Sequence, residues 1–525
     1  MGSITEKIER NKIWSIEDVI EKLKKIRLSG KCAFFSAIVV GVLAHGYAFA
    51  NKLPNSDDII SIRAYGGGLT HGCWLKSILG PVISKFAGNY STPWVIGILS
   101  LLLLAISAVM IVEALKIENI ASGIVIGGVI TSFPSITGNF LFMYMALYFS
   151  LSILMASGAI YFIIREKCIG RQIAGIVLIS CSMGIYQAYF PFVASIWLCD
   201  LIRKCFSEKE DAKIIFWDAI RYLACLVVGM ALYFVIEYFF LWIFHISLSA
   251  HKGINEMGHI ELYLIPEIIL QMYKKMISML YSDFMGLSTE WTMRILIGVS
   301  YLAVILFAIV NGVKQLKRKE YLKVVFGVFF LAIFPIAINL MDIMCANSGE
   351  RVIYILMEYA LSAIFILPII LIDTLKKPLL HWGMLLGGIG IIYCYVNVAN
   401  AAYLYVDLAQ RAVESYYTVM IAEIRGTEGY RSDMDIVFIG DIKDETIYPL
   451  KQEFSNIEMS SMEDVIYRVN WYRENILKYY CGFTSNYKEN YEEEYENIVD
   501  QMPCYPNYGS IQVLGDQVIV KLSDD

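Results

Sequence analysis

The chain has 525 residues, of which 57% are hydrophobic and 18% are charged, with a net charge of −6 at pH 7. The core of a soluble domain does not absorb this much apolar surface, so the composition indicates a membrane protein and excludes an ordinary soluble fold. No basic cluster is interleaved with aromatic residues, which excludes a nucleic-acid-binding surface. The 11 cysteines form no Cys-x-x-Cys pair, which leaves a zinc or redox site without support.

Residues 1–32 are predicted to form a cytoplasmic amphipathic segment. Apolar residues recur at helical spacing from Ile13 to Leu23, beside several lysines. Ser15 and Asp18 have the spacing of a capping box, which favours a helix that begins after Ser15. Such a helix is expected to lie on the membrane surface.

Eleven apolar stretches are predicted to cross the membrane, since a span needs about 20 apolar residues. They lie at 33–50, 94–115, 120–136, 139–164, 172–185, 187–202, 222–246, 293–313, 322–341, 355–373 and 380–400. The stretch from 172 to 202 allows two interpretations, either two short helices hinged at Tyr186 and Gln187 or one long tilted helix. The fold class is therefore an all-α polytopic membrane domain over residues 33–400.

The distribution of Lys and Arg predicts the orientation. With the N-terminus in the cytoplasm, the inner segments hold 24 Lys and Arg residues and the outer loops hold 8. This bias follows the positive-inside rule. Two outer loops, 51–93 and 247–292, are long enough to be functional. The second contains a stretch from Glu261 to Leu270 that is predicted to lie as a helix along the outer interface.

Residues 401–525 are predicted to form a small extracytoplasmic α/β domain. This region holds 23 acidic and 10 basic residues, a net charge of −13. The pattern predicts a buried strand at 435–440, a helix at 462–480, and a hairpin at 511–521 that turns at Gly515 and Asp516. The acidic, Tyr-rich run 489–496 is typical of a solvated helix face.

The densest group of polar residues follows the first predicted span. Asp57 and Asp58 are adjacent there, and Arg63, His71 and Lys76 come after them. A carboxylate can act as a general base toward a sugar hydroxyl, and a cation can stabilise a phosphate leaving group. The same acidic pair could instead cap a loop helix at the membrane surface, and the spacing alone does not decide between these interpretations.

Two acidic residues lie within predicted spans. Ionisable groups at membrane depth are costly and are often functional. Glu237 falls in the seventh span and Glu358 falls early in the tenth, and neither has an obvious charged partner in the sequence. A structural role for both, hydrogen-bonded between helices, is the simpler interpretation.

Three short stretches carry a resemblance to a known family. They are Asn55-Ser-Asp-Asp58 with His71-Gly-Cys-Trp74, Gly184-Ile-Tyr-Gln-Ala-Tyr189, and Glu350-Arg-Val-Ile-Tyr354. An acidic pair after the first span, followed by a glycine-rich segment and many spans, is similar to the GT-C glycosyltransferases. More narrowly, the chain resembles the type II O-antigen glucosyltransferases, the serotype-converting enzymes, over roughly residues 33–400.

The resemblance implies an enzyme at the outer face of the cytoplasmic membrane. Such enzymes transfer a hexose, for example glucose, from a polyprenyl-phosphate sugar to a cell-surface polysaccharide. By this analogy Asp57 or Asp58 would be the catalytic base, Arg351 would hold the lipid phosphate, and Tyr186 and Gln187 would line the cavity.

The chain departs from the family at one point. It has Gly72-Cys73-Trp74 where the family often has Gly-Arg-Trp. If that arginine binds phosphate in the family, then Arg63, His71 or Lys76 must replace it here, or the donor differs. Trp74 is retained as a substrate-binding residue.

A polyprenyl phosphate leaves as a stable anion, so one base and one or two cations would suffice for inverting transfer. No metal cofactor is expected, although Asp57 and Asp58 could coordinate Mg²⁺ or Mn²⁺ through oxygen. The expected partners are the lipid-linked donor, the polysaccharide acceptor, the bilayer, and a flippase or donor synthase.

Two other functions stay open. A lipid-linked saccharide transporter, or flippase, is one, although no internal repeat of the kind common in transporters is evident. A membrane-anchored scaffold of glycan assembly, with the acidic domain as the working part, is the other.

Overall fold

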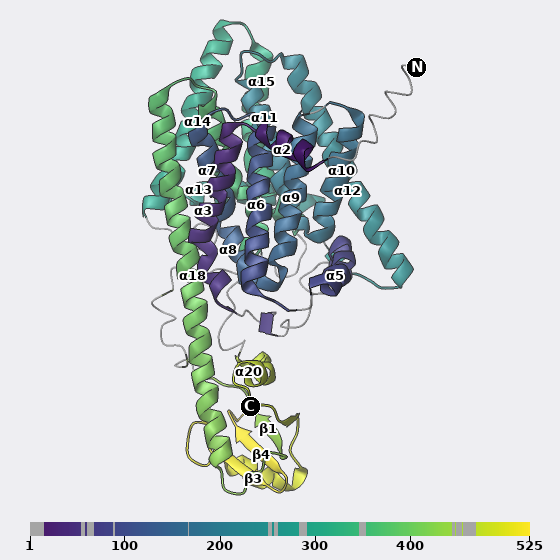
Figure 1. Cartoon of the computed structure of the whole chain (residues 1–525), viewed down its shortest axis with the longest axis vertical. Helices are drawn as coiled ribbons and strands as arrows, with labels where there is room; N and C mark the ends of the chain where they lie inside the picture. Colours follow the sequence, from purple (N-terminus) through teal and green to yellow (C-terminus); the bar gives the residue numbers. More distant parts are fainter. Residues whose placement is uncertain are drawn as a thin grey trace.

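Long apolar stretches form helices here because backbone groups in hydrocarbon must hydrogen-bond within their own segment. The computed structural model describes residues 15–53, 58–59, 68–87, 90–165, 167–249, 255–256, 261–282, 291–345, 353–443, 447, 454 and 469–524. The helices form a bundle, and a small sheet lies beyond one end of it (Figure 1).

Among the described residues, eight helices are long and apolar enough to cross a membrane. They are α3 (Leu28–Ala50), α6 (Pro93–Ala114), α7 with α8 (Ile120–Ser132 and Pro134–Leu141), α9 (Met143–Arg165), α12 (Ala212–Phe244), α14 (Trp291–Lys317), α15 (Tyr321–Ile338) and α18 (Pro378–Gly426). Two shorter apolar helical stretches are α10 (Ile169–Ile185) and residues Tyr359–Asp373, which include α17 (Ala363–Asp373). The chain is therefore a multi-pass membrane protein.

The stretch from 172 to 202 is two helices rather than one. Helix α10 ends at Ile185, the short helix η2 (Gln187–Tyr189) follows, and α11 (Phe190–Cys205) runs back. Tyr186 has extended backbone angles between α10 and η2, and Pro191 lies in the first turn of α11. The hinge therefore lies at Tyr186 and Gln187, one of the two arrangements that the sequence allowed.

The N-terminal helix and the helix in the second long loop follow their sequence signals. Helix α2 (Ile16–Lys24) begins after Ser15, whose hydroxyl accepts from the backbone N–H of Asp18, and the Asp18 carboxylate accepts from the N–H of Ser15. The predicted capping box is thus confirmed. In the second long loop, α13 (Ile265–Ser278) begins four residues later than the predicted helix, after the short helix η4 (Leu262–Leu264).

Small residues allow α3 and α7 to pack with their backbones in contact. A Cβ added at Gly123 would lie 2.3 Å from the carbonyl oxygen of Ser29, and one at Gly127 would lie 2.2 Å from that of Ala33. The Ser29 hydroxyl donates to the Ile117 carbonyl at 2.7 Å. This is the small-xxx-small packing by which membrane helices associate without a hydrophobic driving force.

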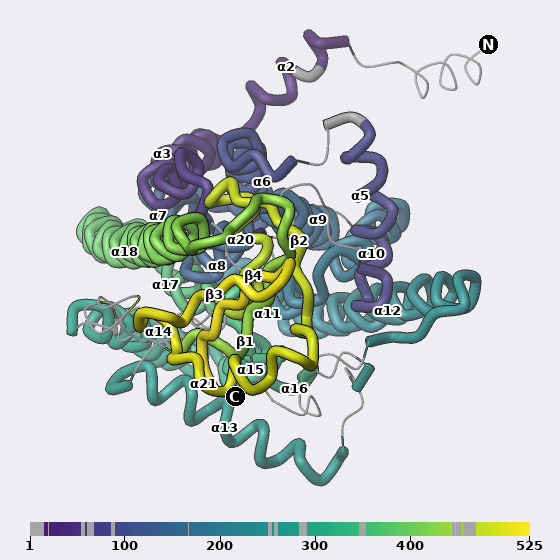
Figure 2. The backbone as a smooth tube through the Cα atoms, turned by 90° about the horizontal axis from the view of Figure 1, so that it is seen from below, coloured from purple at the N-terminus to yellow at the C-terminus, as the bar shows by residue number. Residues whose placement is uncertain are grey.

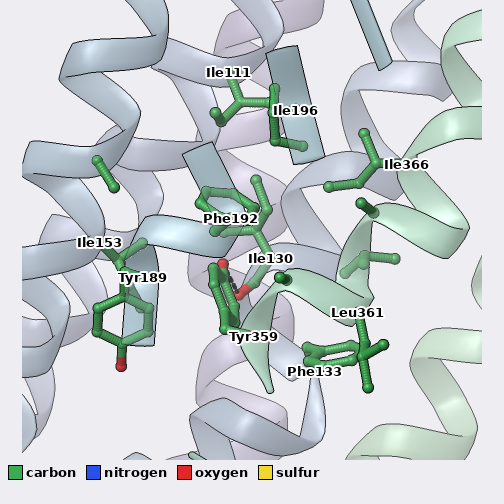
Figure 3. Packing of buried hydrophobic residues seen from close by; sticks show 14 of the residues in the cluster. Ile111, Ile130, Phe133, Ile153, Tyr189, Phe192, Ile196, Tyr359, Leu361 and Ile366 are labelled. Atoms are coloured by element: carbon green, nitrogen blue, oxygen red, sulfur yellow. Dashed lines mark hydrogen bonds between the residues drawn. The ribbon is translucent and has the colours of Figure 1, made fainter. Parts of the chain in front are cut away.

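An aromatic cluster joins the α10–α11 hinge to the start of α17. The Tyr359 ring lies between Tyr189 and Phe192, with ring centroids 5.8 Å and 4.8 Å away (Figure 3). Its hydroxyl donates to the carbonyl of Ile130 at 3.0 Å, which satisfies a polar group in an otherwise apolar core. Tyr359 therefore links the hinge to α7.

Helix α18 continues past the bundle and carries the sheet (Figure 1). Position 401, where the acidic domain was predicted to begin, lies inside this helix. The sheet has the order β2-β1-β4-β3, formed by Asn486–Lys488, Asp435–Ile439, Gln517–Lys521 and Ile511–Leu514. Strand β1 is parallel to both neighbours, and β3 and β4 form the predicted hairpin, with Gly515 at φ 58° in its turn.

The predicted helix at 462–480 is described only in part, as α20 (Arg473–Tyr479), since residues 462–468 lie outside the described ranges. Helix α21 (Glu496–Gln501) follows the acidic run, in which Glu492, Glu493 and Glu494 are exposed. Viewed from the domain side, α20 and β2 lie over the centre of the bundle, and α13 lies at its edge (Figure 2). The small domain therefore stands below the bundle rather than beside it.

Candidate active site

Asp58 joins the first long loop to the start of α9. Its carboxylate is fully buried and accepts hydrogen bonds from the backbone N–H groups of Met143, at 3.0 Å, and Tyr144, at 3.3 Å. It also accepts from Lys52 Nζ at 3.0 Å and from Ser91 Oγ at 3.2 Å. A carboxylate at a helix N-terminus satisfies N–H groups that have no partner within the helix.

This environment shapes the acidity of Asp58. Burial is the largest influence and raises the pKa of its carboxyl, while the Lys52 ammonium and the other donors lower it. Both oxygens are already engaged, so Asp58 has the geometry of an anchor rather than of an open base. Asp57, which directly precedes it, lies outside the described residues, as do Arg63 and Arg351.

Helix α5 (Trp74–Ala87) brings Lys76 to the same turn of α9. The Lys76 side chain is 8% exposed, and its Nζ lies 3.9 Å from the Sδ of Met145. Trp74, two residues earlier, is 7% exposed and stacks on Phe240 of α12, with 6.2 Å between ring centroids. Lys76 and Asp58 thus each contact the first turn of α9, whereas Trp74 packs against α12.

Gln187 fixes the loop that precedes α5. Its Nε2 donates to the backbone carbonyls of His71 and Gly72 and contacts the hydroxyl of Tyr233, each at 3.0 Å. Tyr233 also donates to the Gly72 carbonyl at 2.9 Å. Gly72 has φ 72°, and a Cβ there would lie 2.5 Å from Gln187 Nε2. Only glycine fits this position without strain.

Tyr186 connects the hinge to α9 and to the later part of the chain. Its ring lies 4.9 Å from that of Phe149, in the second turn of α9. It also packs against a buried cluster of Ala188, Met341 and Cys345. The predicted residues Asp58, Lys76, Tyr186 and Gln187 are therefore gathered around the first two turns of α9 and the hinge. His71, whose carbonyl Gln187 holds, is exposed.

An ionic cluster that the sequence did not reveal joins α13, α16 (Leu340–Met344) and Glu358. Lys275 of α13 forms a close ion pair with Glu358 and lies 3.7 Å from a carboxylate oxygen of Asp342 on α16. Glu358, for which the sequence offered no partner, thus has one from a loop 83 residues away. The position of Glu358 within a predicted span was the signal that it needs a partner, but nothing in the local sequence indicated Lys275.

Glu237 is the second acidic residue within a span. It lies on α12, one turn after Tyr233, and is 2% exposed. Its carboxylate is close to the backbone N–H of Trp74, at the start of α5. Glu237 therefore borders the same loop that Gln187 and Tyr233 hold.

The assembled groups can support the transfer of a chemical group at a membrane surface, with a carboxylate as base and a cation near the leaving group. They comprise buried carboxylates, a buried lysine and a loop with fixed backbone conformation, on the end of the bundle that faces the small domain (Figure 1). Within the described part of the chain, no group of three or more His, Cys, Asp or Glu side chains could hold a metal ion.

Comparison with known proteins gives one match. The model of the family described as Glucosyl transferase GtrII matches residues 46–367, more than half of the chain. The matched span contains Asp58, the loop at Gly72, the hinge and the Lys275–Glu358 pair, and it ends before α18. No curated protein and no solved structure matches the chain significantly.

Proposed function

The chain belongs to the GtrII glucosyl transferase family and is thus a glycosyltransferase, and we propose that it transfers a hexose from a polyprenyl-phosphate sugar to a cell-surface polysaccharide. The reaction takes place at the outer face of the cytoplasmic membrane. Eleven passages of the chain leave the N-terminus in the cytoplasm and the acidic domain outside. The loops on the same side as the N-terminus hold more Lys and Arg than the loops on the other side, which supports this orientation.

The arrangement around Asp58 is the observation that carries the proposal. Asp58 binds the N-terminus of α9 and thereby fixes the backbone directly after Asp57. We assign Asp57 as the base and Asp58 as the residue that positions it, because the Asp58 oxygens already have four donors. A base within reach of the acceptor contributes about 10²–10⁴ in rate.

The chemistry balances without further reactants. The acceptor hydroxyl oxygen forms a bond to the anomeric carbon as the bond from that carbon to the phosphate oxygen breaks. The hydroxyl proton passes to the Asp57 carboxylate, and polyprenyl phosphate leaves with the bonding electrons. In-line attack inverts the anomeric centre. Lys76, with His71, Arg63 or Arg351, would stabilise the charge on the leaving phosphate.

The test is a reaction with purified full-length protein in lipid nanodiscs. Polyprenyl-phosphate glucose, galactose and N-acetylhexosamines are supplied singly, with and without a polysaccharide acceptor, and donor consumption and product anomer are measured. We expect one donor to be consumed with inversion and with no loss of rate in EDTA. Failure to consume any of these donors in the presence of an acceptor would refute the donor class, and a strict divalent-ion requirement would refute metal independence.

A further inference from the structure

The C-terminal domain contains a polar cavity outside the family-matched span. It has a volume of about 400 Å³, within the range of about 300–1,000 Å³ that is usual for small-molecule sites. Strands β1 and β2 and the residues at the start of α20 line it. The catalytic proposal uses none of these residues.

Two aromatic rings and a guanidinium form one wall of this cavity. Phe438 and Tyr487 stack with centroids 6.1 Å apart, and the Arg473 guanidinium lies 4.8 Å from the Phe438 centroid. Arg473 also donates to the Asp441 carboxylate at 3.2 Å and to the Gly440 carbonyl at 3.3 Å. The wall is thus built in advance by contacts within the domain, which lowers the entropy cost of binding.

The rim of the cavity offers one apolar face and several polar groups. Trp471 is 70% exposed, so its indole offers an apolar face at the rim. Asn475 and Glu474 line the cavity, and among the described residues neither makes a side-chain hydrogen bond. Asn475 can donate and accept at once, and Glu474 accepts.

We propose that this cavity binds an uncharged saccharide chain, the acceptor of the transfer reaction. A pyranose ring has an apolar C–H face, which an exposed indole can cover, and a belt of hydroxyls, which need groups that both donate and accept. Lys488 and Arg473 are balanced by Glu474 and Glu489 in the lining, so the cavity itself has no strong charge. The net charge of −13 beyond residue 400 disfavours an anionic polymer.

The position of the cavity suits an acceptor rather than the lipid donor. Helix α20 lies between the sheet and the bundle, and in the view from below it lies over the bundle's centre (Figures 1 and 2). A polymer held at α20 therefore lies below the end of the bundle where Asp58 and Gln187 are found. The identification of the saccharide as the acceptor rests on the proposed function, whereas saccharide binding itself does not.

The binding test uses full-length protein in nanodiscs without donor. Uncharged hexasaccharides of glucose, galactose or rhamnose, and a teichoic acid, are titrated by calorimetry against wild type, Trp471→Ala and Asn475→Ala. Tyr508→Ala, which removes a fully exposed aromatic ring outside the cavity, is the matched control. We expect an uncharged hexasaccharide to bind and Trp471→Ala to raise its Kd at least about tenfold, with Tyr508→Ala unchanged.

Three results would overturn the inference: no uncharged hexasaccharide binds, Trp471→Ala binds like wild type, or the teichoic acid binds more tightly. A transfer assay separates this inference from the proposed function. If no polyprenyl-phosphate sugar is consumed but binding depends on Trp471, the proposed function alone fails. If donor is consumed and saccharide binding does not depend on Trp471, the proposed saccharide site alone is wrong.

Discussion

Replacing Asp57 and Asp58 separately by Asn should have different consequences. Asp58→Asn keeps the size of the side chain but turns one acceptor into an N–H donor that faces Lys52, Ser91 or the α9 backbone. Removing one partner of a buried ion pair costs about 3–5 kcal/mol, and the Lys52 side chain is 27% exposed, so we expect a loss of about 2–4 kcal/mol in stability. Asp57→Asn should lower kcat by about 10²–10⁴ and leave stability unchanged.

The assay combines thermal unfolding with single-turnover transfer on the same nanodisc preparations. Asp58→Asn should melt at a lower temperature and lose activity in proportion to its unfolded or displaced fraction, and Asp58→Glu should recover part of both. An Asp58→Asn protein that melts like wild type and yet has no turnover would refute the assignment, because Asp58 would then be the base itself. A destabilised Asp57→Asn protein would refute it equally.

Three further changes test other contacts of the site. Lys52→Met should raise the pKa of Asp58 further above its ordinary value. The variant should therefore lose stability progressively as the pH rises through that pKa, as measured by unfolding between about pH 4 and pH 8. A loss of stability that does not depend on pH would contradict this. Gly72→Ala should lower the free energy of unfolding by about 2–4 kcal/mol, since a Cβ at this left-handed position would lie 2.6 Å from the Tyr233 hydroxyl. The control Gly312→Ala, whose Cβ would have nothing within 4 Å, should be neutral in the same melting assay. Glu358→Gln should lower the melting temperature without the loss of kcat expected for Asp57→Asn, because Lys275 already engages the carboxylate; a comparable loss of kcat would make Glu358 the base.

Much of the helical architecture could be predicted because hydrophobic length is a strong signal in a membrane protein. The hairpin at 511–521 and the capping box at Ser15 were predictable for a similar reason, since turn and cap chemistry are local. The hinge at Tyr186 was ambiguous because the apolar run continues through it. Its two helices separate where Tyr186 becomes extended and Gln187 turns its amide toward the loop at Gly72.

The candidate site was only partly predictable. Residue type and position after the first span singled out Asp58 and Lys76, which both contact the first turn of α9. The family resemblance singled out Gln187, which holds the loop at Gly72. The sequence could not show that Asp58 would be saturated by donors, since two of these are backbone N–H groups 85 and 86 residues away. It could not show the Lys275–Glu358 pair either, because the pair depends on how α13 docks against the bundle.

Ile59 gives the junction between the bundle and the small domain a testable role. Asp58 binds α9, and the next residue, Ile59, is fully buried in the cluster that includes Val413, Tyr417 and the inner face of the sheet. One dipeptide therefore ties the segment that begins at Asp57 to both bodies. If the domain holds the acceptor and Asp57 is the base, loosening Ile59 should uncouple binding from transfer.

The change is Ile59→Ala, which removes three carbons from a packed cluster and costs about 2–5 kcal/mol, against about 0.5–1.5 kcal/mol for the graded control Ile59→Val. We expect Ile59→Ala to bind hexasaccharide like wild type but to transfer sugar to a long polysaccharide more slowly, with Ile59→Val in between. Wild-type transfer by a correctly inserted Ile59→Ala protein would show that the domain and the catalytic loop act independently. Loss of hexasaccharide binding would show instead that Ile59 supports the fold of the domain, because its buried cluster also contains Ile476 and Leu477 of α20.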